Sequence, residues 1–380
     1  MTVNLQTSAS LARLALTDRL LILGTADDIY ANLPFIDPTH GGAVVLGAQA
    51  HTAIRRLRNA YPDVLLLEQP TVHADRAASK EDPFILTSVS AAADQPSLFD
   101  VPPATIKGTL DEQIANGASL GVLPTGFIEA GDVRALQAAV ETANQIERSD
   151  VLLHLPLAHV WISGDGLTKV IAGVKRSAHP IAISLAHKGD PGSQKGVVEG
   201  LRRLVAEAPD VSVWFTDLCG VDAVAHGALA AAIGLTASNR HILAPGNAAF
   251  SPRPSDRSPN ILMRDLLSYR KSRQMHENWF ASMPSPVCTP TSCCGGRALD
   301  SFTGSPDDRN AGHRHNTVQL TEMHKSLLTA SSRDDWWADR LRDAELAYPR
   351  LAMRTGIKSI KPSGSVQRWI DLNAAYGSAP

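Results

Sequence analysis

Residues 151–215 carry the repeating pattern that decides the fold. Three short apolar runs occur there: Val151–Leu155 (VLLHL), Ile181–Leu185 (IAISL) and Val211–Phe215 (VSVWF). Each run is continuous rather than alternating, which is typical of strands buried on both faces of a parallel sheet. The stretches 166–174 and 196–206 between them have apolar residues at helical spacing. This region therefore predicts consecutive strand–helix units.

The same alternation extends in both directions along the chain. Five further strands are expected at Leu20–Leu23, Ala43–Leu46, Val64–Leu67, Leu120–Leu123 and His241–Leu243, with additional helices at Asp132–Ile146 and Val221–Ile233. Eight strand–helix units predict an α/β fold, a (β/α)8 TIM barrel. An open doubly wound sheet is the alternative. The segment after the first strand, Gly24–Asp27, lacks a glycine-rich phosphate loop, which favours the barrel.

Composition limits the function classes. The chain has 380 residues, 44% hydrophobic and 19% charged, with a net charge of −2, as in ordinary globular proteins. It has no global attraction to nucleic acid or membranes, so any basic patch must be local. Residues 1–20 lack a secretory pattern, and no apolar stretch approaches the roughly 20 residues of a membrane span. We therefore expect a cytoplasmic protein, in which clustered cysteines favour metal binding over disulfides.

The expected domain organisation has three parts: a barrel over residues 1–280, a zinc-binding element with helices over 281–350, and a basic tail over 351–380. The long loop at about 69–109 is rich in Pro, Ser, Ala and Asp. In a barrel it would lie at the C-terminal face and cover the site, or be a surface insertion. Further on, Ile261–Phe280, His315–Ala330 and Asp334–Tyr348 are expected to be helical, and Asp300–Gly312 a polar loop.

A cysteine knuckle is the strongest chemical signal. Cys288, Cys293 and Cys294 precede Gly295 and Gly296, and His315 follows. Thiolates and imidazoles are the ligands that zinc prefers in tetrahedral sites, and four protein ligands leave no open position, so the zinc would be structural. Cys293 or Cys294 could serve with Cys288, and His313 is the alternative to His315, with His324 on the same segment. A set of small buried thiols beside surface histidines is the other interpretation.

A barrel followed by such a knuckle and a histidine that opens a helix resembles the tRNA-guanine transglycosylase family. The resemblance implies a structural zinc element and exchange of a base on a nucleic-acid ribose, with an aspartate nucleophile and a second acid. Glu68, at the end of the third strand, is similar in place to the second acid, although the family's Ser-Gly pair is absent. The stretch 234–241 is similar to the nucleophile segment; it retains Arg240 but has no aspartate.

Other reactive groups follow strands, where barrel enzymes collect them. Asp217 ends the apolar run 211–215 and is the best single candidate for a catalytic carboxylate, alongside Glu68. Its structural alternatives are a helix N-cap and a partner for Arg240. His187 and Lys188 could bind an anion, or form a solvated pair in a polar loop. Cys219 is interpreted as a buried thiol, and a histidine inside a strand, such as His154, as a core residue.

Basic residues gather in segment 253–273, just before the knuckle: Arg253, Arg257, Arg264, Arg270, Lys271 and Arg273. With the zinc element, they could contact RNA or DNA phosphates; a solvated helix face balanced by Asp256, Asp265 and Glu277 is the alternative. The sequence predicts a transglycosylase-like protein acting on or binding a base or nucleoside in nucleic acid. An inactive barrel serving as a binding module, or an unrelated small-molecule barrel enzyme, are the alternatives. A homodimer is one of the oligomeric states left open.

Overall fold

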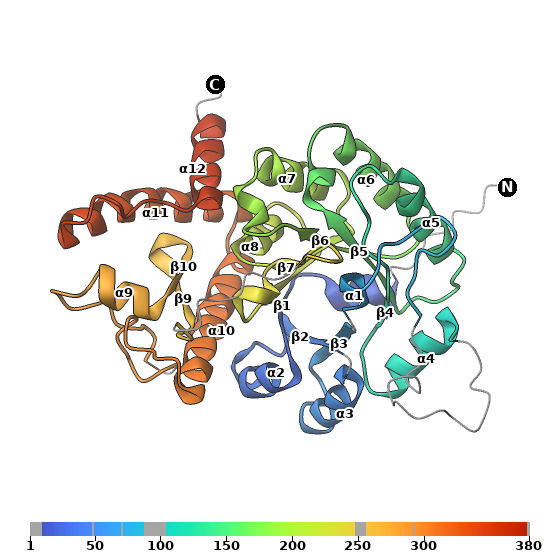
Figure 1. The fold of residues 1–380 in the computed structure, drawn as a ribbon, viewed down its shortest axis with the longest axis horizontal. Coiled ribbons are helices and arrows are strands. Elements are labelled where there is room, and N and C mark those ends of the chain that lie inside the picture. Colours follow the sequence, from blue (N-terminus) through green and yellow to red (C-terminus); the bar gives the residue numbers. More distant parts are fainter. Residues whose placement is uncertain are drawn as a thin grey trace.

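A parallel eight-stranded sheet curls into a barrel at the centre of the molecule (Figure 1). The computed structural model describes residues 10–47, 49–69, 71–86, 104–247, 256–291 and 293–377. The strands are β1 (Arg19–Gly24), β2 (Gly41–Leu46), β3 (Leu65–Gln69), β4 (Gly121–Leu123), β5 (Val151–Ala158), β6 (Ile181–Ala186), β7 (Val211–Thr216) and β8 (Ala230–Gly234). Their order in the sheet is β3-β2-β1-β8-β7-β6-β5-β4. A parallel bridge between Leu67 and Leu120 joins the two edge strands, so the (β/α)8 prediction is confirmed.

Alternation along each strand divides the side chains into an inner and an outer set. Leu21, Leu67, Leu152 and Trp214 belong to the cluster that fills the barrel, whereas their strand neighbours pack against the surrounding helices. Helix α1 (Leu11–Leu16) closes the N-terminal end of the barrel, because its buried face belongs to the same inner cluster. The opposite end, where the strands finish, is the face at which barrel proteins place their sites.

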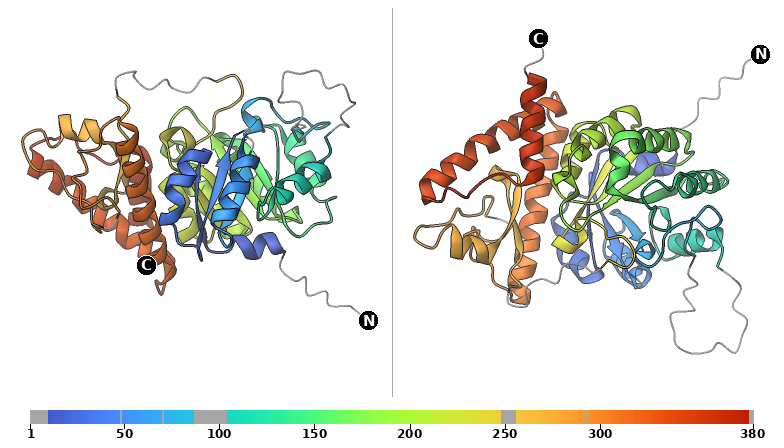
Figure 2. Two further views of the ribbon diagram at one scale, coloured as in Figure 1. Left: turned by 90° about the horizontal axis from the view of Figure 1, so that it is seen from below. Right: turned by 45° about the horizontal axis from the view of Figure 1, so that its top comes forward.

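Eight helices follow the eight strands around the barrel (Figure 2). They are α2 (Ala26–Asn32), α3 (Ala50–Ala60), α4 (Ile106–Ala115), α5 (Val133–Ala143), α6 (Gly164–Arg176), α7 (Val197–Glu207), α8 (Leu218–Ala225) and α10 (Pro306–Leu328). Helix α10 packs on α2 and β1, and the Thr317 hydroxyl donates to Asn32 Oδ1 at 3.3 Å. The last barrel helix is therefore separated from β8 by a long insertion.

The eighth strand was predicted in the wrong place. It is Ala230–Gly234, inside the stretch expected to continue the helix 221–233. Helix α8 instead ends before Gly227, whose φ of +106° suits the residue after a helix C-cap. The run Ala230–Gly234 is apolar throughout, so periodicity could not separate strand from helix, and pairing with β1 and β7 overrides the helix propensity of alanine. The segment 241–243 contributes only the bridge from Ile242 to Ala186.

The insertion after β8 forms a hairpin, not the helix expected over 261–280. Strands β9 (Asn260–Met263) and β10 (Ser268–Lys271) pair antiparallel, and only α9 (Ser272–Asn278) is helical. Leu267, with φ of +47°, breaks any helix between the strands. The polar loop expected over 300–312 is also shorter than predicted, because Ser305 caps α10 and Pro306 begins it.

Two helices complete the chain. The helix expected from residue 334 is confirmed as α11 (Arg333–Thr355), and the segment expected to be a loosely patterned tail contains α12 (Gly364–Gly377). Helix α12 packs on α7 and on the 3-10 turn Pro191–Ser193, so the end of the described chain returns to the barrel (Figure 1). The domain boundary expected at residue 280 stays a prediction. The β9–β10 hairpin, which precedes that boundary, belongs with the cysteine knuckle. Helix α10, which follows it, belongs with the barrel.

Part of the long loop is placed by short bridges. Ala77 pairs with Phe127 and Phe84 with Thr125, which holds the start of the loop against the end of β4. Residues 87–103 of the expected insertion lie outside the described residues. None of the helices described is both long enough and apolar enough to cross a membrane.

Candidate metal centre and barrel mouth

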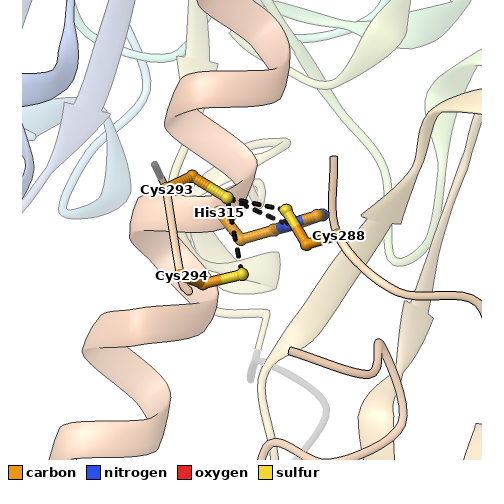
Figure 3. Close-up of side chains that lie close together, drawn as sticks. All are labelled: Cys288, Cys293, Cys294 and His315. Atoms are coloured by element: carbon orange, nitrogen blue, oxygen red, sulfur yellow. Dashed lines mark hydrogen bonds between the residues drawn. The ribbon is translucent and has the colours of Figure 1, made fainter. Parts of the chain in front are cut away.

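Three thiols and one imidazole converge beside helix α10 (Figure 3). Cys288 Sγ lies 2.7 Å from Cys293 Sγ and 3.0 Å from His315 Nδ1. Cys293 Sγ lies 3.4 Å from Cys294 Sγ and 3.7 Å from His315 Nδ1. All four side chains are buried, and the ligand atoms all lie within 4.8 Å of one another. Such a group could hold a metal ion, which confirms Cys288 and His315 as neighbours and brings both Cys293 and Cys294 into the set.

The local backbone explains why these residues meet. Cys288 is held by an amide hydrogen bond to the Arg297 carbonyl, at 2.8 Å, which closes the knuckle. Gly295 and Gly296 have φ near +72° and +71°, a conformation that favours glycine, so the chain can turn directly after Cys294. His315 lies within α10, not at its start, and therefore comes from a rigid element.

The imidazole of His315 is oriented by its second nitrogen. Nε2 lies 3.0 Å from the Leu262 carbonyl oxygen in β9 and donates to it, which leaves Nδ1 facing the thiols. A metal-binding histidine characteristically donates its other N–H to a backbone carbonyl or carboxylate. The neighbouring Asn316 accepts from Leu262 N–H at 2.7 Å, so α10 fixes β9 from two adjacent positions.

The electrostatics of the cluster also suit a cation. Burial and the neighbouring thiols raise the pKa of Cys288, and burial raises the pKa of Cys293 to about 11. Burial lowers the pKa of His315. Without a cation, the neutral forms of Cys288, Cys293 and His315 are therefore favoured. A divalent ion reverses this preference, since it stabilises thiolates directly.

The alternative histidines lie elsewhere. His313 Nδ1 is 3.6 Å from an Asp28 carboxylate oxygen, so it faces α2 and not the thiols. His324 is buried near Asp18 and Arg333, and burial lowers its pKa to about 4. Neither belongs to the cysteine cluster.

A second group of possible ligands lies after strands β6 and β7. Asp190, Asp217 and Cys219 bring their ligand atoms within 4.8 Å of one another. Asp217 caps helix α8 by accepting from Cys219 N–H at 2.9 Å, so its structural alternative as an N-cap is realised. Burial and the Asp217 charge raise the pKa of Asp190 to about 6, and burial raises the pKa of the Cys219 thiol.

Arg240 is buried beside this acidic group. Its Nε donates to the Gly234 carbonyl at 3.1 Å, and its guanidinium carbon lies 3.4 Å from the centre of the Tyr269 ring. The charge of Asp217 acts on Arg240, but among the described residues no ion pair or hydrogen bond joins the two side chains, so the expected pairing stays a prediction. Tyr269 lies in β10, so this stack joins the inserted hairpin to the end of β8. Arg240 is a candidate for binding substrate, but its guanidinium group already contacts Gly234 and Tyr269 within the protein.

Glu68 does not join Asp217. It alternates with Leu67 and Gln69 on β3, and its paired residue Val45 belongs to the outer core between strands and helices. Glu68 therefore faces the helix layer near Glu112. Burial and the Glu112 charge raise its pKa to about 7. The two candidate carboxylates thus lie at the ends of strands that β2, β1 and β8 separate in the sheet.

A cavity of about 520 Å³ opens between the end of the barrel and the inserted hairpin. Its lining includes the cations Lys188, Arg257, Lys271 and Arg309 together with His241, while Asp256 is the single acid among the described residues that line it. A second cavity of about 450 Å³ shares Asp256, Arg257 and Ser258 with it and continues to Arg273. His187 accepts from Gly189 N–H at 3.0 Å and contacts the His159 ring. Of the expected basic segment, Arg253 lies outside the described residues.

A group of polar side chains lies around His154 inside the barrel. The prediction that His154 is a core residue is confirmed, because its buried ring lies between Gln69, 3.2 Å from Nδ1, and Ser184, 2.8 Å from Nε2. His73, from the turn Val72–Ala74, covers this group with its ring centre 5.6 Å from that of His154. The sequence signal for this group is the spacing of polar residues that face the barrel interior near strand ends. Using that signal requires the strand register, because the register decides which residues face inward.

Comparisons with known proteins do not assign this chain to a family. No protein-family model matches the sequence. A search of curated proteins finds no match either.

Proposed function

We propose that this protein binds nucleic acid in the basic cavity between its barrel and its inserted module, and acts there on a base or nucleoside in the manner of a transglycosylase. One observation carries the proposal. Lys188, Arg257 and Arg309 are exposed around one cavity, and none of them forms an ion pair within the described residues. Unpaired cations around a groove are what a phosphate backbone requires.

The acidic candidates adjoin this cavity. His241 lines it, and the charge of Asp190 acts on His241. Asp190 and Asp217 would then stand beside the bound strand, where burial and the Asp217 charge raise the pKa of Asp190 to about 6. A carboxylic acid beside a carboxylate can donate a proton to a leaving base while the other stabilises positive charge on the sugar. Glu68 has no part in this arrangement.

For the metal centre we propose a structural zinc ion held by Cys288, Cys293, Cys294 and His315. Three thiolates and one imidazole are a common closed tetrahedral set for zinc, and metal–sulfur bonds of about 2.3 Å would separate the sulfur atoms by about 3.8 Å. The Cys293–Cys294 separation of 3.4 Å is close to this, whereas Cys288 would move outward from its 2.7 Å approach to Cys293. Bound there, the ion would hold the hairpin and knuckle on α10.

Fluorescence anisotropy with labelled RNA and DNA oligonucleotides tests the binding. We expect affinity that falls steeply with salt. The variant Lys188→Ala/Arg257→Ala/Arg309→Ala should bind about tenfold or more weakly and lower the slope of log K against log salt by about 2 to 3. A matched control removes three exposed cations from the outer helices, Arg56, Arg134 and Lys169. Equal loss in both triple variants would reject the cavity as the binding surface.

A protein that only binds nucleic acid is the second candidate function, because the segment Gly234–His241 lacks an acid and Asp217 serves as a helix cap. Base release or base exchange on the bound oligonucleotide separates the two candidates. Wild-type turnover that Asp217→Asn and Asp190→Asn abolish, with unchanged oligonucleotide affinity, supports the enzyme. Binding without turnover supports the binding module.

A further inference from the structure

We propose that the mouth of the barrel contains a second site, a closed chamber that accepts a small, flat, uncharged molecule with both hydrogen-bond donors and acceptors. It goes beyond the proposed nucleic-acid surface and does not depend on it. The chamber is formed by Gln69, His73, His154, Ser184 and Trp214, from β3, the turn after it, β5, β6 and β7.

Unpartnered polar atoms are the first observation. Gln69 Oε1, His73 Nδ1 and Trp214 Nε1 are buried and have no hydrogen-bond partner among the described residues, and their residues are 0%, 3% and 0% exposed. More than nine in ten buried polar groups in folded proteins are paired, because an unpaired one pays its full desolvation cost. Three such atoms around one histidine call for a molecule that supplies an acceptor to the indole and a donor to the amide oxygen.

Backbone strain at the same place is the second observation. Thr71 and Phe215 are two of the four non-glycine residues with positive φ in the described chain, at +60° and +49°. A branched or aromatic side chain in this region is costly, and such residues persist mainly at ligand clamps and switches. Thr71 precedes the turn that carries His73, and the Phe215 ring contacts His73 at 5.4 Å between centres.

The chemistry of the walls decides the ligand class. The rings of Trp214 and Phe215 lie nearly parallel to His154, at 29° and 27°, so the chamber has flat aromatic surfaces. Among the described residues, the hydrogen-bond and ring partners of Gln69, His73 and His154 are all uncharged. Burial lowers the pKa of His73 to about 4 and that of His154 well below its usual value, so both rings are neutral. An ion would lose its hydration without a counter-charge here, which a neutral ligand avoids.

His73 is the residue that must move. The imidazole ring of His73 comes from a turn, whereas the other walls of the chamber come from strands. Rotation of the turn Val72–Ala74 about Thr71 would remove one ring from above His154 and open the chamber toward the C-terminal face. The ligand then replaces the His73 ring in contact with Phe215 and His154.

An isosteric charge series tests both parts of the proposal. Benzamide, benzamidinium and benzoate share one shape, and we expect only benzamide to bind, as measured by calorimetry or saturation-transfer NMR. His73→Ala removes the cover and should bind benzamide about tenfold more tightly than wild type, ~1.4 kcal/mol. Gln69→Leu should abolish the binding; if it does not fold, Trp214→Phe, which deletes the indole N–H, should weaken it. His159→Ala, outside the chamber, should bind as wild type does.

Three results would overturn the chamber: binding of either ion as tightly as benzamide, absence of benzamide binding to His73→Ala, or retained binding in Gln69→Leu and Trp214→Phe. Oligonucleotide affinity is measured on the same variants. It should not change in His73→Ala, so failure of the chamber leaves the nucleic-acid proposal standing, and failure of that proposal leaves the chamber standing.

Discussion

Two groups of side chains with metal-ligand chemistry lie in the described chain, and they differ in how their charge is balanced. The cysteine cluster contains three thiols and His315 and has no acid among its members. The acidic group contains Asp190, Asp217 and Cys219 and has the buried cation Arg240 beside it. A cation bound by the first group would be balanced by thiolates, whereas the second group already has a cationic side chain beside it.

The two groups also differ in whether their possible ligand atoms already have hydrogen-bond partners. In the cysteine cluster, the one nitrogen that points away from the thiols is bonded to the Leu262 carbonyl, so the ligand atoms remain available. In the acidic group, Asp217 caps α8 and Asp190 caps the turn Pro191–Ser193, with its oxygen accepting from Gly192 N–H at 2.8 Å. Two similar sets of side chains therefore differ: the cysteine cluster could hold a metal ion, whereas the two carboxylates already cap helical turns.

Loss of the proposed zinc ion should have the largest effect. Cys288→Ser or treatment with a strong chelator should remove about one zinc per chain and lower the melting temperature by on the order of 10 °C, because metal binding there contributes folding free energy. Cys219→Ser is the matched control and should keep its metal. Elemental analysis and thermal unfolding measure both. Wild-type protein with less than a tenth of a zinc per chain would contradict the metal centre.

Removal of the Asp217 carboxylate should have a smaller effect. Asp217→Ala deletes the cap of α8 and the charge beside Arg240, which should lower the free energy of unfolding by about 1–2 kcal/mol. Asp217→Asn retains a capping oxygen and should lose less than half as much. Urea unfolding gives the values. Zinc content should stay at the wild-type level in both variants, and its loss would show that the two groups are not independent.

The smallest effect concerns Glu68 and depends on pH. Its folded-state pKa is raised from 4.5 to about 7, so between these values the folded protein holds a proton that the unfolded chain has released. Its contribution to stability therefore falls as pH rises through this window. Glu68→Gln should match wild type at pH 5 and exceed it by ~1–2 kcal/mol at pH 8, measured by urea unfolding. A pH-independent difference would contradict the buried, helix-facing placement.

The strands and the metal ligands were predictable for different reasons. Continuous apolar runs bounded by turns located seven of the eight barrel strands, because burial on both faces leaves a local composition signal. The eighth, Ala230–Gly234, carries no such contrast with the helix before it. The cysteines could be found because thiols close together in sequence can reach one ion, whereas the choice of His315 over His313 depended on which side of α10 faces the knuckle.

The acids show the limit of strand-end reasoning. Glu68 and Asp217 both end apolar strands, but one residue of alternation decides whether a side chain enters the barrel or faces the helices. Gln69, one position later, enters the barrel and bonds to His154. Position in the sequence could not show which of Glu68 and Gln69 faces the barrel interior. That depends on where β3 begins and ends.

The sequence by itself determined the strand–helix repeat, hence the barrel, and the local gathering of thiols and cations, because these depend on residues close together along the chain. The tertiary structure alone decided which residues meet across long separations: His315 with the knuckle, Tyr269 with Arg240, and Gln69 with His154. Such meetings depend on register, on where β8 begins, and on the insertion before α10. These features follow from packing of the whole chain and leave no local pattern.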